Sequence, residues 1–448
     1  MDRSGEVLGS SEHATETAPD GTQDPEQVVA AALASLQGLA EQVPGPYLAL
    51  GLSGAMHSLV LVEGARSVSP AWLWSEARPS QLLGQLRAEL DPGEVYRRTG
   101  CPLQTPYLPA KLAWLRARGV RLSGRRLIAL ADWVAHALTG RWTTSLGLAS
   151  ASGLLDAASA VWDSELLAHF HLHPSQLPEV LEGTAVAGEL RPEPARRCQL
   201  QAGLPVVAGT SDGAAACLGS GLRPDQTAIT VGTSGAVRRL ERRSALHPQE
   251  RTFSYRAYQD LWINGAATNS AGLLLERMRE LLGYAGAEQL LAEAASSPPG
   301  ALGVTVLPYF AGERSPYWRA DLSASVLGLG REHRRPHLAR ASLESSCFLL
   351  HRLLQDVSPE TDRAWLSGKI TSSPLWCQIL ADVTQTELEL VRSADASALG
   401  AAWLALGVTE APAAETATCR PSRDLERRHS YQIAEARYAQ WHQRLWGN

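Results

Sequence analysis

The sequence lacks the features that would mark a nucleic-acid-binding or membrane protein. Basic and acidic residues are interspersed and the net charge is only -5, so no basic stripe is available for a phosphate backbone. No stretch reaches the roughly 18 apolar residues that a membrane-spanning helix needs. We therefore expect neither nucleic acid nor a membrane as a partner.

Clustered cysteines and an export signal are also missing. The opening residues, MDRSGEVLGSSEH, contain no apolar segment of the kind that directs secretion. The six cysteines form no Cys-x-x-Cys pair and have no histidine cluster nearby; they are Cys101, Cys198, Cys217, Cys347, Cys377 and Cys419. This pattern favours reduced thiols in a cytoplasmic protein and gives no metal-ligand spacing.

What the chain does have is length and a globular composition. Its 448 residues exceed the roughly 250 to 300 at which one hydrophobic core stops growing, which predicts two domains. Charged residues make up 19% and apolar residues 45%, as in ordinary folded proteins. Apolar β-branched runs alternate with helical patterns along the sequence, which favours an α/β fold.

The stretch from Pro205 to Gly235 carries the strongest local signal. Two apolar runs, Val206 to Ala208 and Thr227 to Val231, each end in a turn of small residues, GTSDG and GTSG. A turn of Gly, Thr and Ser after a strand leaves backbone N–H groups bare, and bare amides are what a phosphate group requires. The stretch therefore predicts two strands, each followed by a turn suited to a phosphate, and we expect it to contribute to both sides of a cleft.

Asp212 is the only charged residue of the first turn, and it admits two interpretations. A carboxylate beside a phosphate cradle is repelled unless it binds a metal or accepts a proton, which points to phosphoryl transfer with Asp212 as the base. Alternatively, Asp212 caps a short helix from Gly213 to Leu218, and GTSG is a simple hairpin turn. Local sequence alone weighs these about equally.

A second group of polar residues follows the predicted strand Tyr47 to Leu52. The loop after it ends in Met56 and His57, and His57 is either a polyol ligand or, more commonly, a histidine satisfied within the protein. Trp74, Glu76 and Arg78 place an aromatic face beside an acid and a base, the combination that holds sugars by stacking and by charged hydrogen bonds. The alternative is a surface pair of Glu76 and Arg78 near a packed tryptophan.

Periodic patterns predict several helices. Asp24 followed by a proline is a helix start, and this helix should run to about Gln42. We expect further helices over Leu127 to Leu138, Pro336 to Leu354 and Ala396 to Leu406. Trp365 to Asp382 should form a strand, a glycine turn and a helix.

Beyond these local patterns, the chain resembles the FGGY family of carbohydrate kinases from Gly5 onward. The most specific piece is Ala324 to Glu344, which follows the family's C-terminal signature. The matching residues are Val326, Gly328-Leu329 and, after a seven-residue gap, His337-Leu338 and Ala341-Ser342-Leu343-Glu344. The segments GTSDG, GTSG, AGERSPYW, SSPLWCQILAD and LGAAWLA then occur in the family's order. The resemblance implies two actin-like (ribonuclease-H-like) domains around a central cleft, a sugar-binding domain over 1–215 and a nucleotide-binding domain over 216–448.

The resemblance also implies roles for individual residues, with ATP and Mg²⁺ as the phosphate donor and its metal. Asp212 matches the general base that deprotonates the sugar's terminal hydroxyl, and it is also the candidate ligand for a Mg²⁺ ion carried by ATP. The sugar-facing residues would be Met56, His57, Trp74, Glu76 and Arg78. The nucleotide-facing residues would be Gly232, Thr233, Ser234, Gly235, Gly368 and Ser373.

Within the family, SGAMHSLVLVEG, VYRRTGCPLQTPYLPAKLAWL and ITVGTSGAVRR are most similar to gluconate kinases, and xylulokinases come next. The expected substrate is therefore a small sugar or sugar acid, with gluconate favoured. Arg238 is the candidate partner for a sugar-acid carboxylate. The resemblance is also compatible with a homodimer.

Three departures from the family pattern qualify this expectation. The family's opening hairpin, with Asp-x-Gly-Thr-Thr, has no counterpart, so we expect a first domain without its opening strands. Lys369 stands where the family has a second glycine, and strain is expected there if the position requires a positive φ. Glu76 replaces a usual aspartate. These departures leave two alternatives: a catalytically impaired relative that binds a sugar acid or a partner without turnover, or an active kinase whose start codon is misassigned.

Overall fold

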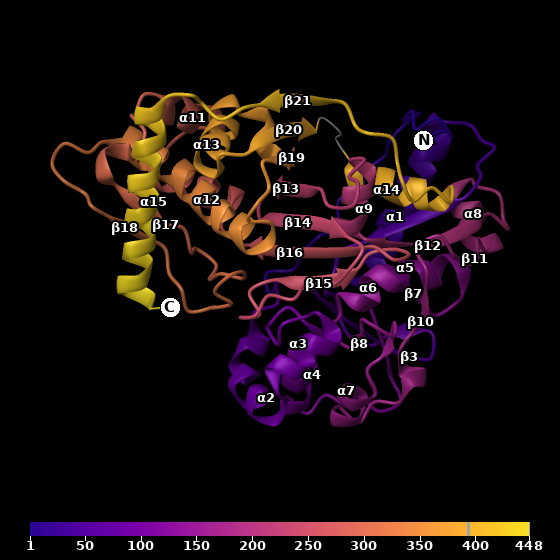
Figure 1. Cartoon of the computed structure of the whole chain (residues 1–448). Helices are drawn as coiled ribbons and strands as arrows, with labels where there is room; N and C mark the ends of the chain where they lie inside the picture. Colours follow the sequence, from indigo (N-terminus) through magenta and orange to yellow (C-terminus); the bar gives the residue numbers. More distant parts are fainter. Residues whose placement is uncertain (392–394, 448) are drawn as a thin grey trace.

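The computed structural model describes residues 1–391 and 395–447, and its largest element is a seven-stranded mixed sheet. The strands run in the order β15-β16-β14-β13-β19-β20-β21, as Figure 1 shows from bottom to top. Their bounds are β15 (Phe253–Arg256), β16 (Trp262–Thr268), β14 (Gly235–Glu241), β13 (Thr227–Val231), β19 (Arg363–Gly368), β20 (Glu387–Val391) and β21 (Thr416–Cys419). The central trio β13, β19 and β20 is parallel, and the outer pairs are antiparallel.

Helices of the second half cover this sheet and bury its apolar residues. Helix α12 (Arg335–Val357) is buried almost all round between residues 339 and 350, which explains its apolar sequence and confirms the helix predicted over Pro336 to Leu354. Its buried Glu344 is balanced by Arg340, whose Nε donates to it over 2.7 Å. The other helices here are α10 (Gly272–Leu281), α11 (Ala287–Ala295), α13 (Pro374–Thr384) and α15 (Leu425–Trp446), with the short pair β17 (Thr305–Leu307) and β18 (Ser325–Leu327).

The first half contains two three-stranded sheets and three two-stranded pairs among its described residues. One three-stranded sheet has the order β11-β12-β2, built from β11 (Val186–Glu189), β12 (Pro205–Ser211) and β2 (Leu50–Gly54); the other has the order β4-β3-β6, built from β4 (Arg66–Ser67), β3 (Val60–Glu63) and β6 (Arg126–Ile128). Strand β6 corrects the helix expected over Leu127 to Leu138. Leu127 pairs with Leu61 in an antiparallel ladder, so helix α5 (Leu130–Thr139) begins only after it.

Helices enclose both three-stranded sheets. Helix α1 (Pro25–Gln42) begins where predicted, because the Asp24 carboxylate accepts a hydrogen bond from the Glu26 amide and Pro25 occupies the first turn. The remaining helices are α2 (Leu83–Glu89), α3 (Pro92–Thr99), α4 (Leu108–Ala117), α6 (Leu146–Ser150), α7 (Ser164–His169), α8 (Pro192–Cys198) and α9 (Asp212–Gly219). The remaining strands are β1 (Thr22–Gln23), β5 (Ala71–Trp72), β7 (Thr143–Ser145), β8 (Leu155–Asp156), β9 (Val161–Trp162) and β10 (Glu179–Leu181). They form the two-stranded pairs β1-β5, β10-β7 and β8-β9.

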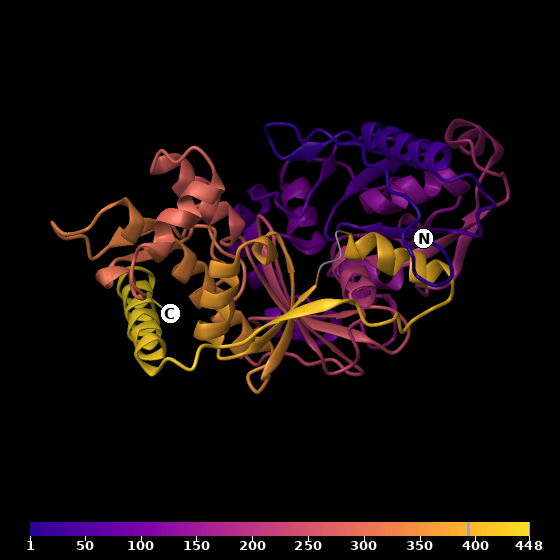
Figure 2. The ribbon, with the colours of Figure 1, turned by 90° about the horizontal axis from the view of Figure 1, so that it is seen from above.

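The two halves are joined by a close packing of helices. Helix α14 (Ala396–Ala405) belongs to the C-terminal part of the chain, yet it lies beside α9 and strand β2 of the first half (Figure 2). Glycines make this approach feasible, since a Cβ on Gly400 would lie 1.9 Å from the Ala215 carbonyl oxygen and one on Gly219 would lie 1.9 Å from that of Ala396. The chain thus returns to the first half after building the second.

None of the helices in the described part of the chain is long and apolar enough to cross a lipid bilayer.

Candidate active site

The ends of four strands carry the loops that hold His57, Asp212, the GTSG turn and Gly368. Strands β2 and β12 are parallel and pair Gly54 with Ser211, so the loop to His57 and the start of helix α9 follow neighbouring strand ends. Strands β13 and β19 are also parallel and pair Val231 with Gly368, so the GTSG turn and the Gly368 turn lie at one sheet edge. Each of these two loop pairs is therefore assembled by a parallel register, and the GTSDG and GTSG turns lie at the ends of two different sheets.

Asp212 is the first residue of helix α9, one position after the N-cap Ser211. Its carboxylate accepts a hydrogen bond from the Gly213 amide over 2.7 Å, which satisfies one oxygen. Burial raises the pKa of Asp212, and the positive charges of Arg238 and Arg314 together with the Gly213 amide oppose that rise. Ser211 stands at the N-cap position, but its side chain makes no capping hydrogen bond, and the Asp212 carboxylate bonds to an amide of the first turn instead, as the capping interpretation expected. Asp212 also carries a raised pKa, which suits a proton acceptor.

Arg238 lies against the start of the same helix. A Cβ on Gly213 would lie 2.8 Å from the Arg238 Nε, so only a glycine allows this guanidinium to sit over the helix N-terminus. Its Nη1 donates to the Thr230 hydroxyl over 3.3 Å. Arg238 is therefore beside the base, where a substrate carboxylate or a phosphate would also be attracted.

His57 adopts a left-handed backbone conformation with φ of 65° at the end of the β2 loop. Its Nδ1 lies 2.8 Å from the Ala151 carbonyl oxygen, which can only accept, so Nδ1 carries the proton and Nε2 has a free lone pair. Burial and the nearby Lys111 lower the pKa of His57 to about 3. The ring packs edge-on against Tyr107 at a centroid distance of 4.9 Å. His57 is thus a neutral side chain with one acceptor to offer, while Met56 packs against the apolar cluster beside it.

Lys111 is a site residue that the sequence did not reveal. It is fully buried in helix α4, and its Nζ donates to the carbonyl oxygens of His57 and Pro106. Burial lowers the pKa of Lys111 to about 7. Because it joins the His57 loop to the turn before Tyr107, it fixes two walls of the site. Within an apolar helical pattern, a single lysine gave no sign of this role.

Glu76 is buried and pairs with Arg78, whose side chain is 39% exposed, so the pair reaches the protein surface on the arginine side. The Arg78 Nε donates to the Glu76 carboxylate over 2.7 Å and Nη2 bonds to its other oxygen, so both oxygens are occupied. Burial opposes ionisation of Glu76, but the hydrogen bonds from Arg78 outweigh it and lower its pKa. Trp74 is 37% exposed and offers its ring face to the guanidinium of Arg314, whose Cζ lies 4.8 Å from the ring centroid.

The GTSG segment is a hairpin turn between β13 and β14, as the simpler interpretation expected. The Gly232 amide donates to the Ser234 carbonyl oxygen over 2.9 Å, and helix α10 begins directly against the turn. The Gly272 and Leu273 amides donate to the carbonyl oxygens of Gly232 and Thr233. Thr233 is exposed and Gly235 is buried under the helix. The start of helix α10 thus fixes the turn by hydrogen bonds, while Thr233 remains exposed to solvent.

The Gly368 turn requires its glycine. Gly368 has φ of 92°, and a Cβ there would lie 2.4 Å from the Val231 carbonyl oxygen. Ser373 is buried, and its hydroxyl accepts from the Trp376 amide as the N-cap of α13. Lys369 does not show the strain that its replacement of a glycine predicted: it is exposed in a short 3₁₀ turn, and it is absent from the residues with positive φ. A side chain is tolerated there because it extends into solvent.

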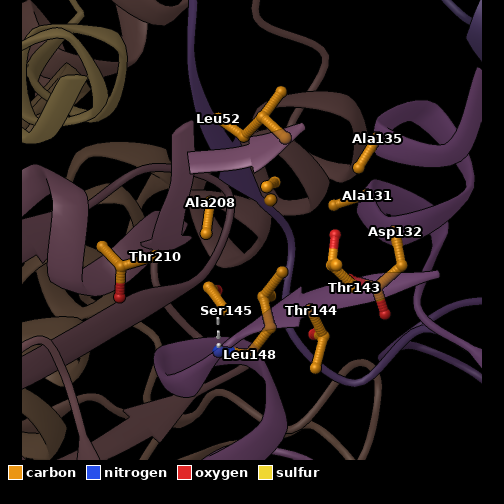
Figure 3. Close-up of a pocket in the computed structure, with 12 residues that line it drawn as sticks. Leu52, Ala131, Asp132, Ala135, Thr143, Thr144, Ser145, Leu148, Ala208 and Thr210 are labelled. Carbon is orange, nitrogen blue, oxygen red and sulfur yellow. Dashed lines mark hydrogen bonds between the residues drawn. The ribbon is translucent and has the colours of Figure 1, made fainter. Parts of the chain in front are cut away.

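A small void, lined by apolar side chains and a few polar ones, lies between strands β2 and β12 and helix α5 (Figure 3). Its volume of about 10 Å³ suits a single water molecule and no sugar. Asp132 borders it and accepts from the Ala129 amide over 2.9 Å, and burial raises the pKa of Asp132 to about 7. The void therefore belongs to the support of the strands that carry His57 and Asp212.

Comparisons with known proteins agree with this geometry. The N-terminal domain of the FGGY family of carbohydrate kinases matches residues 1–219, and the family's C-terminal domain matches residues 227–407. A gluconokinase of Bacillus subtilis is 27% identical over 86% of this chain and 79% of its own length. A xylulose kinase of Lactococcus lactis is 29% identical over 90% of this chain and 84% of its own length.

Among solved structures, a ligand-bound xylulose kinase from Lactobacillus acidophilus superposes with a TM-score of 0.92 at 23% identity, covering 99% of this chain and 94% of that one. At that identity the superposition establishes the fold, which is the predicted pair of actin-like domains. The two family matches together span most of the sequence. The chain belongs to the FGGY family of carbohydrate kinases, which are ATP-dependent phosphotransferases.

Proposed function

We propose that this protein transfers the γ-phosphoryl group of ATP to the terminal hydroxyl of a sugar acid, with gluconate as the favoured acceptor. The observation that carries the proposal is the position of Asp212, a carboxylate of raised pKa just after the end of β12, where Arg238 of the second half lies against the next residue, Gly213. In this scheme Asp212 accepts the hydroxyl proton, the freed oxygen attacks the γ-phosphorus, and ADP leaves.

The remaining site residues position the two reactants. Neutral His57 offers Nε2 to a sugar hydroxyl, and Trp74 offers its face to the carbon chain. The GTSG turn and Gly368 take the phosphates and adenosine. Arg238 is the partner for the acid's carboxylate, a role supported by its place over the helix start beside Asp212.

Mg²⁺ fits this site as a companion of ATP rather than as a resident ion. Among the described residues, no group of three or more His, Cys, Asp or Glu side chains is arranged to hold a metal. Mg²⁺ is commonly bound by one or two carboxylates together with phosphate oxygens and water, so Asp212 suffices as the protein ligand. When bound, the ion would neutralise charge on the phosphates.

The identity of the acceptor is the part of the proposal to be measured, since the relatives include both gluconokinases and xylulose kinases at similar identity. The test is ADP release by the purified full-length chain with gluconate, xylulose or glycerol, with the phosphorylated product identified by mass spectrometry. We expect the highest kcat/KM with gluconate. A tenfold preference for xylulose would assign a ketose instead.

The same assay separates turnover from binding alone. Thermal stabilisation by gluconate without ADP or phosphorylated product would identify a catalytically impaired binding protein. We also propose that the protein acts in the cytoplasm, a view supported by its free cysteines, five of which are buried.

A further inference from the structure

Arg314 lies on a second-half loop between β17 and β18 that is fixed to the end of strand β16. The preceding residue, Glu313, is buried and accepts hydrogen bonds from the Thr268 hydroxyl over 2.7 Å, the Asn269 amide over 2.8 Å and the Arg314 amide over 2.7 Å. The Ser315 amide donates to the Ala267 carbonyl oxygen over 3.0 Å. The backbone on both sides of Arg314 is therefore rigidly held.

The side chain of Arg314 crosses to the sugar-facing residues of the first half. Its guanidinium lies over the Trp74 ring, and its charge acts on His57, Tyr107 and Asp212. Burial lowers the pKa of Arg314, although a guanidinium stays charged at any ordinary pH. Arg314 thus contacts the proposed sugar-facing residues of the first half from a second-half loop, as does Trp318 of the same loop, whose ring centroid lies 6.3 Å from that of Tyr107.

Most of the hydrogen-bonding capacity of this guanidinium is unused. Nη2 donates to the Thr268 carbonyl oxygen over 3.1 Å, while Nε is buried and has no partner among the described residues. A guanidinium has five N–H donors, and leaving buried donors unpaired is costly. A ligand rich in oxygen atoms between Trp74 and Asp212 would supply the missing acceptors.

We infer that Arg314 is a substrate-binding residue, which donates hydrogen bonds to oxygen atoms of the acceptor from across the cleft. This inference rests on the proposed kinase function and adds that a residue of the second half also binds the acceptor. The atoms it binds are a carboxylate in a sugar acid or hydroxyl and carbonyl oxygens in a neutral sugar, because a guanidinium serves both. The stacking on Trp74 holds its plane in the orientation that such contacts need.

The test compares Arg314→Met and Arg314→Lys with the matched variant Arg256→Met. Arg256 makes the same kinds of contact elsewhere: its Cζ lies 5.2 Å from the Trp262 ring and its Nη2 donates to the Gln259 carbonyl oxygen over 2.9 Å. We expect Arg314→Met to raise KM for the acceptor roughly 30-fold and to leave KM for ATP within about threefold. Arg314→Lys should recover part of the loss, and Arg256→Met should match the wild type.

Measuring the acceptor KM with both gluconate and xylulose distinguishes a contact to a carboxylate from a contact to sugar hydroxyls. A larger loss for gluconate than for xylulose assigns the contact to a carboxylate, and equal losses assign it to sugar hydroxyls; both support the inference. An unchanged acceptor KM, or an equal rise in KM for ATP, overturns it.

If the wild type binds gluconate without turnover, the proposed function fails, and the inference is then read from gluconate-induced thermal shifts. Loss of the shift in Arg314→Met, with part of it recovered in Arg314→Lys and all of it kept in Arg256→Met, supports the inference. A shift that persists in the Arg314 variants overturns it.

Discussion

The proposed acceptor side and the proposed nucleotide side of the site are built in different ways. On the proposed acceptor side, charged and aromatic side chains, most of them buried, bond to one another: Arg78 to Glu76, Lys111 to the His57 carbonyl, and Tyr107 to Tyr255 at 2.5 Å. On the nucleotide side, turns of small residues at the ends of β13 and β19 present mainly backbone. Side chains fixed in place can distinguish one sugar from another, whereas bare amides bind phosphate with little regard for the rest of the molecule.

This contrast predicts that nucleotide binding depends on backbone shape and acceptor binding on side-chain placement. The sharpest test on the nucleotide side is Gly368→Ala. The new Cβ would meet the Val231 carbonyl oxygen at 2.4 Å in a positive-φ backbone, so the turn must shift. We expect a cost of about 2 kcal/mol, seen as a roughly 30-fold rise in KM for ATP with the acceptor KM unchanged.

Gly283→Ala is the matched control, because Gly283 has a similar φ of 67° but no atom within 4 Å of its built Cβ. It should carry only the backbone cost and leave KM for ATP unaltered. If both substitutions raised KM for ATP equally, ATP binding would not depend on the close contact at Gly368.

The next largest effect is expected on the acceptor side, from Lys111→Met. The substitution keeps the apolar stem and leaves the carbonyl oxygens of His57 and Pro106 without their buried donor. We expect the acceptor KM to rise about tenfold, KM for ATP to stay within twofold and the free energy of unfolding to fall by about 2 kcal/mol. Steady-state kinetics and urea titrations would measure these changes.

The same variant has a pH signature with a definite sign. The pKa of Lys111 is about 7 in the folded protein and about 10.5 when unfolded, so the unfolded chain binds more protons between these values. Wild-type stability should therefore rise with pH across this window more steeply than that of Lys111→Met. Parallel stability curves would contradict the burial of this charge.

A smaller effect is expected from Arg238→Gln, which removes a positive charge beside Asp212. The charge of Arg238 lowers the pKa of Asp212, which burial has raised, so Arg238→Gln should raise it further. Because the base must be ionised, the acidic limb of the kcat profile should move to higher pH by roughly one unit. An unmoved limb at saturating substrate would mean that Asp212 does not titrate in that limb.

The smallest effect is expected from Lys369→Ala. Lys369 is exposed and lies outside the positive-φ positions, so KM for ATP should stay within about twofold. A tenfold rise would show instead that its ammonium reaches a phosphate.

The same contrast explains how much of the site could be predicted from the sequence. The turns at Asp212, Gly232 to Gly235 and Gly368 were found because each is a local pattern of small residues after an apolar strand. Local patterns also singled out His57, Trp74, Glu76 and Arg78, and the family resemblance assigned them to the sugar; these roles stay predictions. Lys111 and Arg314 were missed, since each acts through partners distant in sequence: Lys111 lies 54 residues from His57.

The secondary structure was predictable where the signals for an element lie within the element itself. Helices α1 and α12 carry their own caps and apolar periodicity, and both formed where expected. Strand β6 was mistaken for the start of α5, because an apolar run of a few residues suits either element and only its pairing with β3 decides. The absence of strain at Lys369 was likewise out of reach, since the need for a glycine depends on a φ that no local pattern fixes.

The most direct test of the central claim, that a single carboxylate at the junction transfers the proton, is the rate of ADP release by Asp212→Asn. The variant keeps the size of the side chain, so thermal shifts with acceptor and with ATP should show that both ligands still bind. We predict that kcat for the preferred acceptor falls by about 10³-fold. A variant that binds both ligands and retains more than a tenth of the wild-type rate would contradict the account.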